Sequence, residues 1–123
     1  MNRLTICLLA FFLYFASAAV FAADPVIKTV AEVHQEKAQL SGEQVQINGK
    51  VVKINNQIMG RNFLHLQDGT GQSGTNDLTI TSQETAQVGD TVIITGTVST
   101  NVDFGSGYLY PLLIEKATIA KVQ

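Results

Sequence analysis

The stretch Asn62-Phe63-Leu64-His65-Leu66-Gln67-Asp68-Gly69-Thr70-Gly71 is followed shortly by Asp77-Leu78-Thr79-Ile80-Thr81. Apolar and polar residues alternate with a period of two in both segments, as in a strand with one buried face. The Asp-Gly pair and the second glycine between the segments favour a turn. The sequence therefore predicts two antiparallel strands on a one-sided sheet. The side chains expected to point inward are Leu64, Leu66, Leu78 and Ile80.

Three further strands are expected around this pair. In residues 45–54 the apolar residues change parity after Val51, with Gly49 just before, which predicts a bulge or bend that lets a small sheet curl. A turn at 88–90 precedes the fourth strand, and the fifth covers 108–119. Residues 55–61 and 100–107 are expected to be loops. Five strands, with the first and fourth bent, predict a small closed or nearly closed all-β barrel.

A helix is predicted before the barrel. Thr29 followed by Glu32 has the spacing of a capping box, and apolar residues recur at helical intervals up to Leu40. Ser41-Gly42 is expected to end the helix after about three turns. The predicted organisation is a signal peptide over residues 1–22, an extended lead and helix over 23–44, and the barrel over 45–123.

The amino-terminal residues have the pattern of a secretory signal peptide. Arg3 precedes an apolar run over 8–15, and small residues follow as far as Ala23. The run is shorter than the roughly 20 apolar residues of a membrane-spanning helix, so cleavage is expected after Ala22, with Ala23 as the alternative. The mature protein is then expected to be periplasmic or secreted, without a membrane span.

Removal of this segment changes the composition of the chain. It takes away Cys7, the only cysteine, so disulfides and thiolate metal sites are excluded from the mature protein. Without Arg3 the chain keeps 7 of its 8 basic residues beside 10 acidic ones, a formal charge of −3. Proteins that neutralise phosphates normally carry a basic excess, so this balance disfavours nucleic acid as the ligand.

Four segments line up in order: Gly49-Lys50-Val51-Val52, then 63–71, then Val88-Gly89-Asp90, then 92–98. The succession resembles the oligonucleotide/oligosaccharide-binding (OB) fold, in the anticodon-binding-like branch of small exported bacterial proteins. It is also similar to the periplasmic bacterial OB-fold stress proteins, which share a strand ending in Asp-Gly-Thr-Gly. The resemblance covers roughly residues 45–121 and implies a five-stranded OB-fold barrel with one N-terminal α-helix.

One departure from the family concerns the helix that usually lies between its third and fourth strands. Residues 82–87 leave room for one turn at most. The helix over residues 30–40 has an apolar stripe that must be buried, so we expect it to fill an end of the barrel instead.

The resemblance also implies a binding face, because OB folds bind ligands on the outer face of strands two and three, between the loops that join strands one to two and four to five. Phe63 is expected on this face, either as a stacking platform or as a ring covered by residues 58–60 or by Phe104. Arg61 and Asp103 are expected to form a weak loop-to-loop ion pair. The candidate ligand-binding residues are Met59, Arg61, Phe63, His65, Gln67, Asp103, Phe104 and Tyr108.

No catalytic arrangement is recognisable, since no serine shares a motif with a histidine and Gly69-x-Gly71 precedes no helix. We therefore expect a non-enzymatic binding module without a cofactor, whose ligand is a small molecule, an oligosaccharide or a segment of a partner protein. Three alternatives stay open. They are an envelope stress or electron-transfer accessory protein acting by protein contact, a nucleic-acid-binding OB domain, and copper or haem handling through Met59 and His65.

Overall fold

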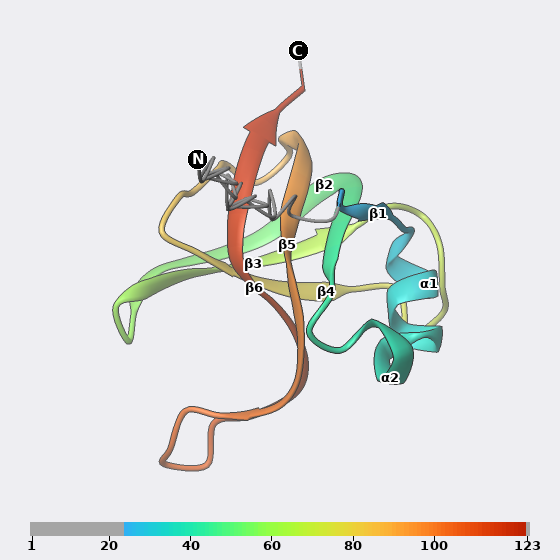
Figure 1. Cartoon of the computed structure of the whole chain (residues 1–123). Helices are drawn as coiled ribbons and strands as arrows, with labels where there is room; N and C mark the ends of the chain where they lie inside the picture. Colours follow the sequence, from blue (N-terminus) through green and yellow to red (C-terminus); the bar gives the residue numbers. More distant parts are fainter. Residues whose placement is uncertain (1–23, 123) are drawn as a thin grey trace, which may run out of the picture.

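Six strands form one sheet within residues 24–122, the part of the chain that the computed structural model describes. The order is β1-β2-β3-β4-β6-β5, and β2 also pairs with β5, so the last five of these strands close into a barrel (Figure 1). The all-β, OB-like barrel is thereby confirmed. The strands are β1 Val26–Ile27, β2 Gln44–Ile58, β3 Arg61–Gln67, β4 Leu78–Ser82, β5 Thr91–Asp103 and β6 Leu109–Lys121.

The antiparallel pair predicted from the alternating segments is β3 and β4, with Leu64 opposite Ile80. Leu64, Leu66 and Leu78 are each 1% exposed, and Ile80 is fully buried. They form the barrel core with aliphatic side chains of β2, β5 and β6. Burying one such side chain stabilises a fold by roughly 1.5–3 kcal/mol, so these alternating residues account for much of the barrel's stability.

β2 is long and bent, as predicted. It pairs with β5 up to Lys50 and with β3 from Lys50 onward, and the register to β3 shifts between Val51 and Lys53. A Cβ at Gly49 would lie 2.9 Å from both the Gln67 carbonyl oxygen and Leu66 Cγ. Glycine is therefore required where β2 crosses closely over β3.

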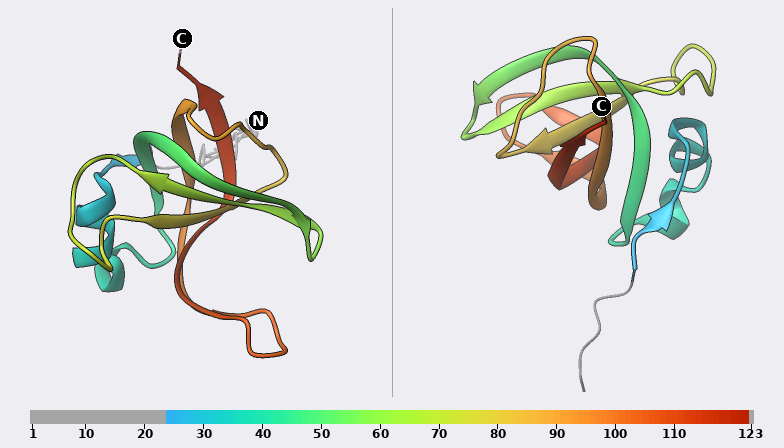
Figure 2. Two further views of the ribbon diagram at one scale, coloured as in Figure 1. Left: turned by 180° about the vertical axis from the view of Figure 1, so that it is seen from behind. Right: turned by 90° about the horizontal axis from the view of Figure 1, so that it is seen from above.

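The predicted loop over residues 55–61 is wrong, because all of it except Met59 and Gly60 belongs to strands. The predicted loop over 100–107 is confirmed for residues 104–107 and wrong for 100–103, which continue β5. β2 runs to Ile58, and Met59 and Gly60 make a two-residue turn with φ of 51° and 76°, the positive values of a type I′ turn. β5 runs to Asp103 before β6 begins at Leu109. Two hairpins therefore project from the barrel (Figures 1 and 2). Their strands leave the core, so the apolar alternation that marks a half-buried strand is lost.

The predicted helix begins as expected, with the complete Thr29–Glu32 capping box. It is interrupted at Glu36, which gives α1 Val30–Gln35 and α2 Lys37–Leu40. The apolar residues Val30, Val33 and Leu40 join the core, so the helices close one end of the barrel. The loop over residues 83–90 lies on the side away from them, where Ala86 packs against the core (Figure 1).

The Asp-Gly-Thr-Gly turn fastens α1 to the barrel. The Val30 N–H donates to Asp68 Oδ2 at 2.9 Å, and the Ala31 N–H donates to Thr70 Oγ1 at 3.0 Å. Burial raises the pKa of Asp68, but the hydrogen bonds from Thr70 and the Val30 backbone outweigh it and hold the pKa below its usual 3.8. The turn therefore has a structural task beyond joining β3 to β4.

β1 was not predicted as a strand. It pairs in parallel with β2, with Val26 opposite Val45. The expected signal peptide over residues 1–22 lies outside the described residues. In residues 24–122 the helices are too short to cross a membrane.

Candidate functional site

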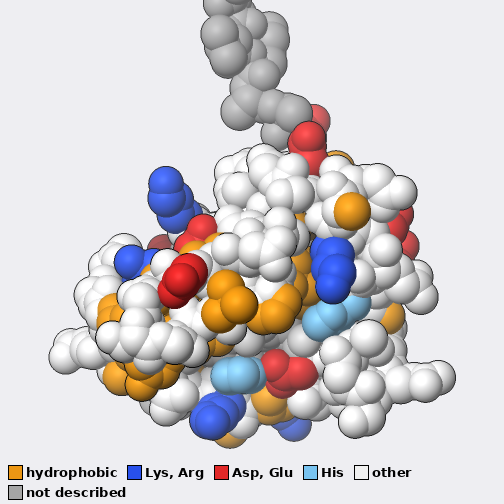
Figure 3. Space-filling model, turned by 90° about the horizontal axis from the view of Figure 1, so that it is seen from below, with side chains coloured by type: hydrophobic (Ala, Val, Ile, Leu, Met, Phe, Trp, Pro, Cys, Tyr) orange, Lys and Arg blue, Asp and Glu red, His pale blue; other side chains and the backbone are white. Residues whose placement is uncertain are grey.

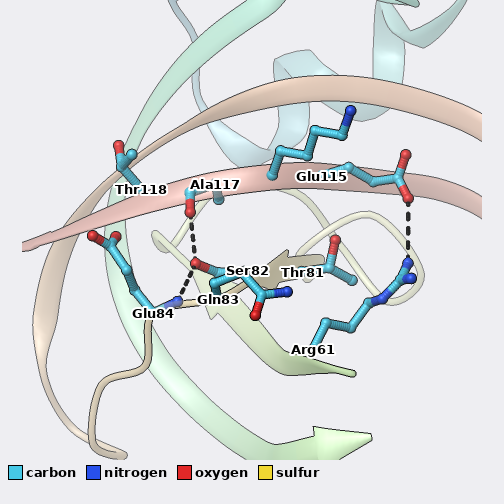
Figure 4. Close-up of a pocket in the computed structure, with 9 residues that line it drawn as sticks. Arg61, Thr81, Ser82, Gln83, Glu84, Glu115, Ala117 and Thr118 are labelled. Carbon is cyan, nitrogen blue, oxygen red and sulfur yellow. Dashed lines mark hydrogen bonds and ion pairs between the residues drawn. The ribbon is translucent and has the colours of Figure 1, made fainter. Parts of the chain in front are cut away.

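A cleft opens between β4 and β6. The two strands pair in parallel at Ile80 and Ile114 and part beyond that point. The resulting space of about 430 Å³ is called the β4–β6 cleft here (Figure 4). It is lined by Arg61, Thr81, Ser82, Gln83, Glu84, Glu115, Lys116, Ala117 and Thr118.

Side-chain hydrogen bonds fix the floor of the cleft. Ser82 Oγ donates to the Ala117 carbonyl at 2.6 Å and accepts from the Glu84 N–H at 2.9 Å. Glu84 Oε2 accepts from the Ile119 N–H at 2.5 Å. These side chains replace the backbone ladder that the separated strands no longer make, so they set the width of the cleft.

A bulge in β6 shapes the opposite wall. The β5–β6 register shifts between Thr95 and Thr97, and Lys116 has a left-handed φ of 52°. A Cβ at Gly96 would lie 2.7 Å from Ile114 Cγ2, so β5 needs a glycine there. Bulges redirect side chains, and here the bulge includes two of the lining residues, Lys116 and Ala117.

Arg61 lies at one end of the cleft. Its guanidinium carbon is 4.6 Å from the ring centroid of Phe104, and its Nη1 is 4.0 Å from Glu115 Oε1. The predicted pair with Asp103 is wrong, since Asp103 Oδ1 accepts from the Gly105 N–H at 2.7 Å and Glu115 is the acidic neighbour of Arg61. Within residues 24–122 the guanidinium makes no hydrogen bond, and the Arg61 side chain is 34% exposed, so N–H donors remain for a ligand.

Three rings form an aromatic cluster next to Arg61. Phe63 lies 5.9 Å from Phe104 and 5.7 Å from Tyr110, and Phe104 lies 5.7 Å from Tyr110, between ring centroids. Phe63 is only 4% exposed. Of the two interpretations of Phe63, the covered ring is the one observed, with Phe104 as the cover. Tyr110 was not among the predicted residues.

The remaining predicted residues are spread over the molecule. Met59 and Tyr108 are exposed at the tips of the two hairpins. His65 Nδ1–H donates to Asp77 Oδ1 at 2.7 Å, and Gln67 donates to Asp77 Oδ2 at 3.3 Å. His34 Nε2–H donates to the Asp77 carbonyl at 2.7 Å. The chain's two histidines consequently lie on the same face, with an acidic side chain between them (Figure 3).

This distribution bears on copper or haem binding. Met59 is in the β2–β3 turn, and at about 3.3 Å per residue along β3 it is roughly 20 Å from His65. Met59 and His65 therefore cannot bind the same metal ion. Across residues 24–122 there is no group of three or more His, Cys, Asp or Glu residues suited to a metal.

The structure therefore brings the side chains of three predicted residues, Arg61, Phe63 and Phe104, into contact. Asp103 and Tyr108 lie beside Phe104 in the same hairpin, whereas Met59 is at the other hairpin tip and His65 and Gln67 contact Asp77. Sequence reasoning missed the acidic and hydroxyl residues of the cleft. One local feature of the sequence points to this region. Ile114 and Ala117 are both buried although a regular strand would place residues three apart on opposite faces, so their spacing indicates the bulge in β6.

Comparison with known proteins gives a fold and no family. Neither protein-family models nor curated proteins match the chain. Among solved structures, it is similar to a protein assigned as an aspartyl-tRNA synthetase from Leishmania major Friedlin, with a TM-score of 0.56 and 16% identity. The match covers 85% of this chain and 22% of the other, so the chain spans about a fifth of that protein. At this identity the likeness concerns the barrel fold alone.

Proposed function

We propose that the chain is an exported, non-enzymatic OB-type binding module that holds a small polar ligand in the β4–β6 cleft. The observation that carries this proposal is the environment of the Arg61 guanidinium. Its guanidinium is positioned by Phe104 and neighbours Glu115, yet its hydrogen-bonding capacity is unused among the described residues. A positioned but unsatisfied donor at the end of a cleft is what a binding site for a polar group requires.

The lining favours a neutral, hydroxyl-bearing ligand such as an oligosaccharide. Arg61 and Lys116 are balanced by Glu84 and Glu115, so the cleft has no excess charge that would select a phosphate chain. Guanidinium, carboxylate, amide and hydroxyl groups supply both donors and acceptors. The volume of about 430 Å³ is within the range of small-ligand sites.

The amino-terminal pattern supports export. Its charged start, apolar middle and small-residue end are those of a secretory signal, which would deliver the barrel to the bacterial envelope or beyond. The resemblance to periplasmic OB-fold stress proteins supports the same location. Mass spectrometry of the protein purified from a periplasmic fraction tests it, and an intact residue 1 on that protein would contradict cleavage after Ala22.

Calorimetric titration tests the cleft. Oligomers of N-acetylglucosamine and of glucose are the probes, with single-stranded DNA as the competing ligand. Arg61→Gln and Glu115→Gln are each expected to weaken sugar binding about tenfold or more, because a hydrogen bond to a charged group contributes about 1.5–3 kcal/mol. Lys53→Gln is the control, since Lys53 is exposed on β2 and does not line the cleft.

Two results would contradict this assignment. Sugar binding that Arg61→Gln leaves unchanged would place the site elsewhere. Salt-dependent binding of single-stranded DNA, without sugar binding, would restore nucleic acid as the ligand.

A second candidate function is contact with a protein partner through the two hairpin tips. Four large apolar side chains are exposed there: Ile58 and Met59 at one tip, and Tyr108 and Leu109 at the other. Exposed apolar residues gathered at projecting tips are typical of interaction surfaces. Co-purification with one envelope protein that Met59→Ser and Leu109→Ser abolish, and that Arg61→Gln leaves intact, would favour this function over the cleft.

A further inference from the structure

The tip of the β5–β6 hairpin, residues 102–110, makes its hydrogen bonds within itself, as far as residues 24–122 show. Val102 pairs with Tyr110 and Asp103 with Leu109, and the Phe104 N–H donates to the Tyr108 carbonyl at 2.9 Å. Within residues 24–122 no hydrogen bond or ion pair joins this tip to another strand. Its position therefore depends on side-chain packing.

The hairpin has a natural bending point just before this tip. Asn101 has a φ of 53°, a left-handed conformation that glycine and asparagine adopt most readily and that interrupts the extended backbone of β5. Pro111 lies opposite, between the pairs Thr100–Leu112 and Val102–Tyr110, and has no N–H to give to the ladder. The hairpin turns aside toward its tip in Figure 1 and in the left view of Figure 2. One left-handed residue in β5 and one missing donor opposite it in β6 weaken the ladder at the same level, which is suited to a hinge.

The tip closes over β3 through two contacts. Phe104 and Tyr110 cover Phe63, and the Arg61 guanidinium lies over the Phe104 ring. Arg61 is also the residue at the end of the β4–β6 cleft, 4.0 Å from Glu115. A ligand group that binds the Arg61 guanidinium in the cleft competes with the Phe104 ring for it. Ligand binding then favours release of the tip, and release of the tip favours ligand binding to the same extent, because coupling between two sites is reciprocal.

We propose that residues 102–110 form a flap, hinged at Asn101 and Pro111, which Arg61 holds closed over Phe63. Opening of the flap exposes Phe63 beside the cleft, as an apolar surface for the ring face of a ligand. The regulatory role of the flap rests on the proposed function of the cleft. The movement itself is a property of the unliganded protein.

Hydrogen exchange of the unliganded protein tests the movement. The amides of Phe104 and Tyr108 are expected to exchange at least about 100-fold faster than those of Leu64 and Ile80, because a flap opens without unfolding the barrel. Arg61→Gln is expected to speed exchange at Phe104 and Tyr108 by about two- to fivefold, the loss of one exposed cation–π contact. Lys53→Gln is the control, with no change expected. The proposal would be overturned if the flap amides exchanged at the same rate as the Leu64 amide, or if Arg61→Gln left the exchange rates of Phe104 and Tyr108 unaltered.

A fluorescence reporter gives a second, independent measurement. The chain has no tryptophan, so Phe63→Trp introduces a single one beneath the flap. Asn101→Val is expected to displace the flap, because a β-branched residue resists a positive φ, and so to shift the emission to the red and increase acrylamide quenching. Unchanged emission and quenching would show that the flap does not control access to residue 63. Both experiments omit the sugar, so failure of sugar binding and failure of the flap are distinguishable.

Discussion

The two ends of the barrel are held by different kinds of interaction. At the helical end, the carboxylate of Asp68 and the hydroxyl of Thr70 accept the first N–H groups of α1, while Val30 and Val33 are fully buried. At the hairpin end, residues 102–110 are held by three rings and one guanidinium. Directional bonds to a buried helix resist local opening, whereas packing at the surface permits it. The helical end therefore serves stability, and the hairpin end is where we propose movement and binding.

Asp68→Ala is the variant expected to have the largest effect on this comparison. It leaves the Val30 and Thr70 N–H groups without their acceptor at a partly buried site, where each unsatisfied group costs about 1–3 kcal/mol. The free energy of unfolding in urea should fall by about 2–4 kcal/mol. Asp103→Ala is the matched control. Among residues 24–122 its side chain accepts a single hydrogen bond, from the Gly105 N–H in the hairpin tip, so the cost should stay below about 1 kcal/mol. Equal costs would remove the distinction between the two ends.

The pH dependence of stability sharpens the same contrast. The pKa of Asp68 is lowered in the folded protein, so its ionised form contributes stability above the unfolded pKa of about 3.9, and this is lost as pH falls through the folded value. The difference in unfolding free energy between wild type and Asp68→Asn should be largest at pH 6–7 and should narrow below about pH 4. Urea titrations at both pH values measure it. A gap that stays constant on acidification would mean that the ionised carboxylate is not the acceptor that matters.

The helical end and the core were largely readable from the sequence. Leu64, Leu66, Leu78 and Ile80 alternate because their strands have one buried face, and the change of parity after Val51 marks a real bulge. The capping box at Thr29 is equally local. Such features depend on residues that are neighbours along the chain, and the period of the pattern reports them directly.

The hairpin end was harder to predict for a physical reason. Residues 100–103 form a strand that has left the core, so its polar sequence resembles a loop. The β4–β6 cleft depends on where two distant strands part, and the partners of Ser82 and Glu84 are 35 residues further along the chain. Arg61 and Phe104 were recognised as site candidates from the fold's usual binding loops. Their contact with each other, and that of Arg61 with Glu115, required the three-dimensional structure.

Phe104→Ala should have a smaller effect on stability than Asp68→Ala. The substitution removes two ring contacts and the stack with Arg61, and aromatic pairs contribute about 0.5–1.5 kcal/mol each beyond buried area. The unfolding free energy should drop by about 1–2 kcal/mol. Amide exchange in α1 should change only as much as this global loss requires, since the three rings pack on one another and α1 is held by Asp68 and Thr70. A selective loss of protection in α1 would show that the two ends are coupled.

Arg61→Gln should have the smallest effect on stability and thereby separate binding from folding. Arg61 is partly exposed, its contact with Glu115 at 4.0 Å is too long for a hydrogen bond, and a cation–π contact such as that with Phe104 contributes about 0.5–1 kcal/mol at an exposed site. The unfolding free energy should therefore fall by about 1 kcal/mol or less. Glutamine keeps a polar side chain of similar reach but loses the charge and the planar fork of donors. Thermal unfolding and sugar titration of the same samples measure stability and binding together. Because Arg61 belongs to the hairpin end, we expect lost binding with retained stability. A fall in stability as large as that of Asp68→Ala would instead make Arg61 a structural residue, and the division between a stabilising end and a binding end would fail.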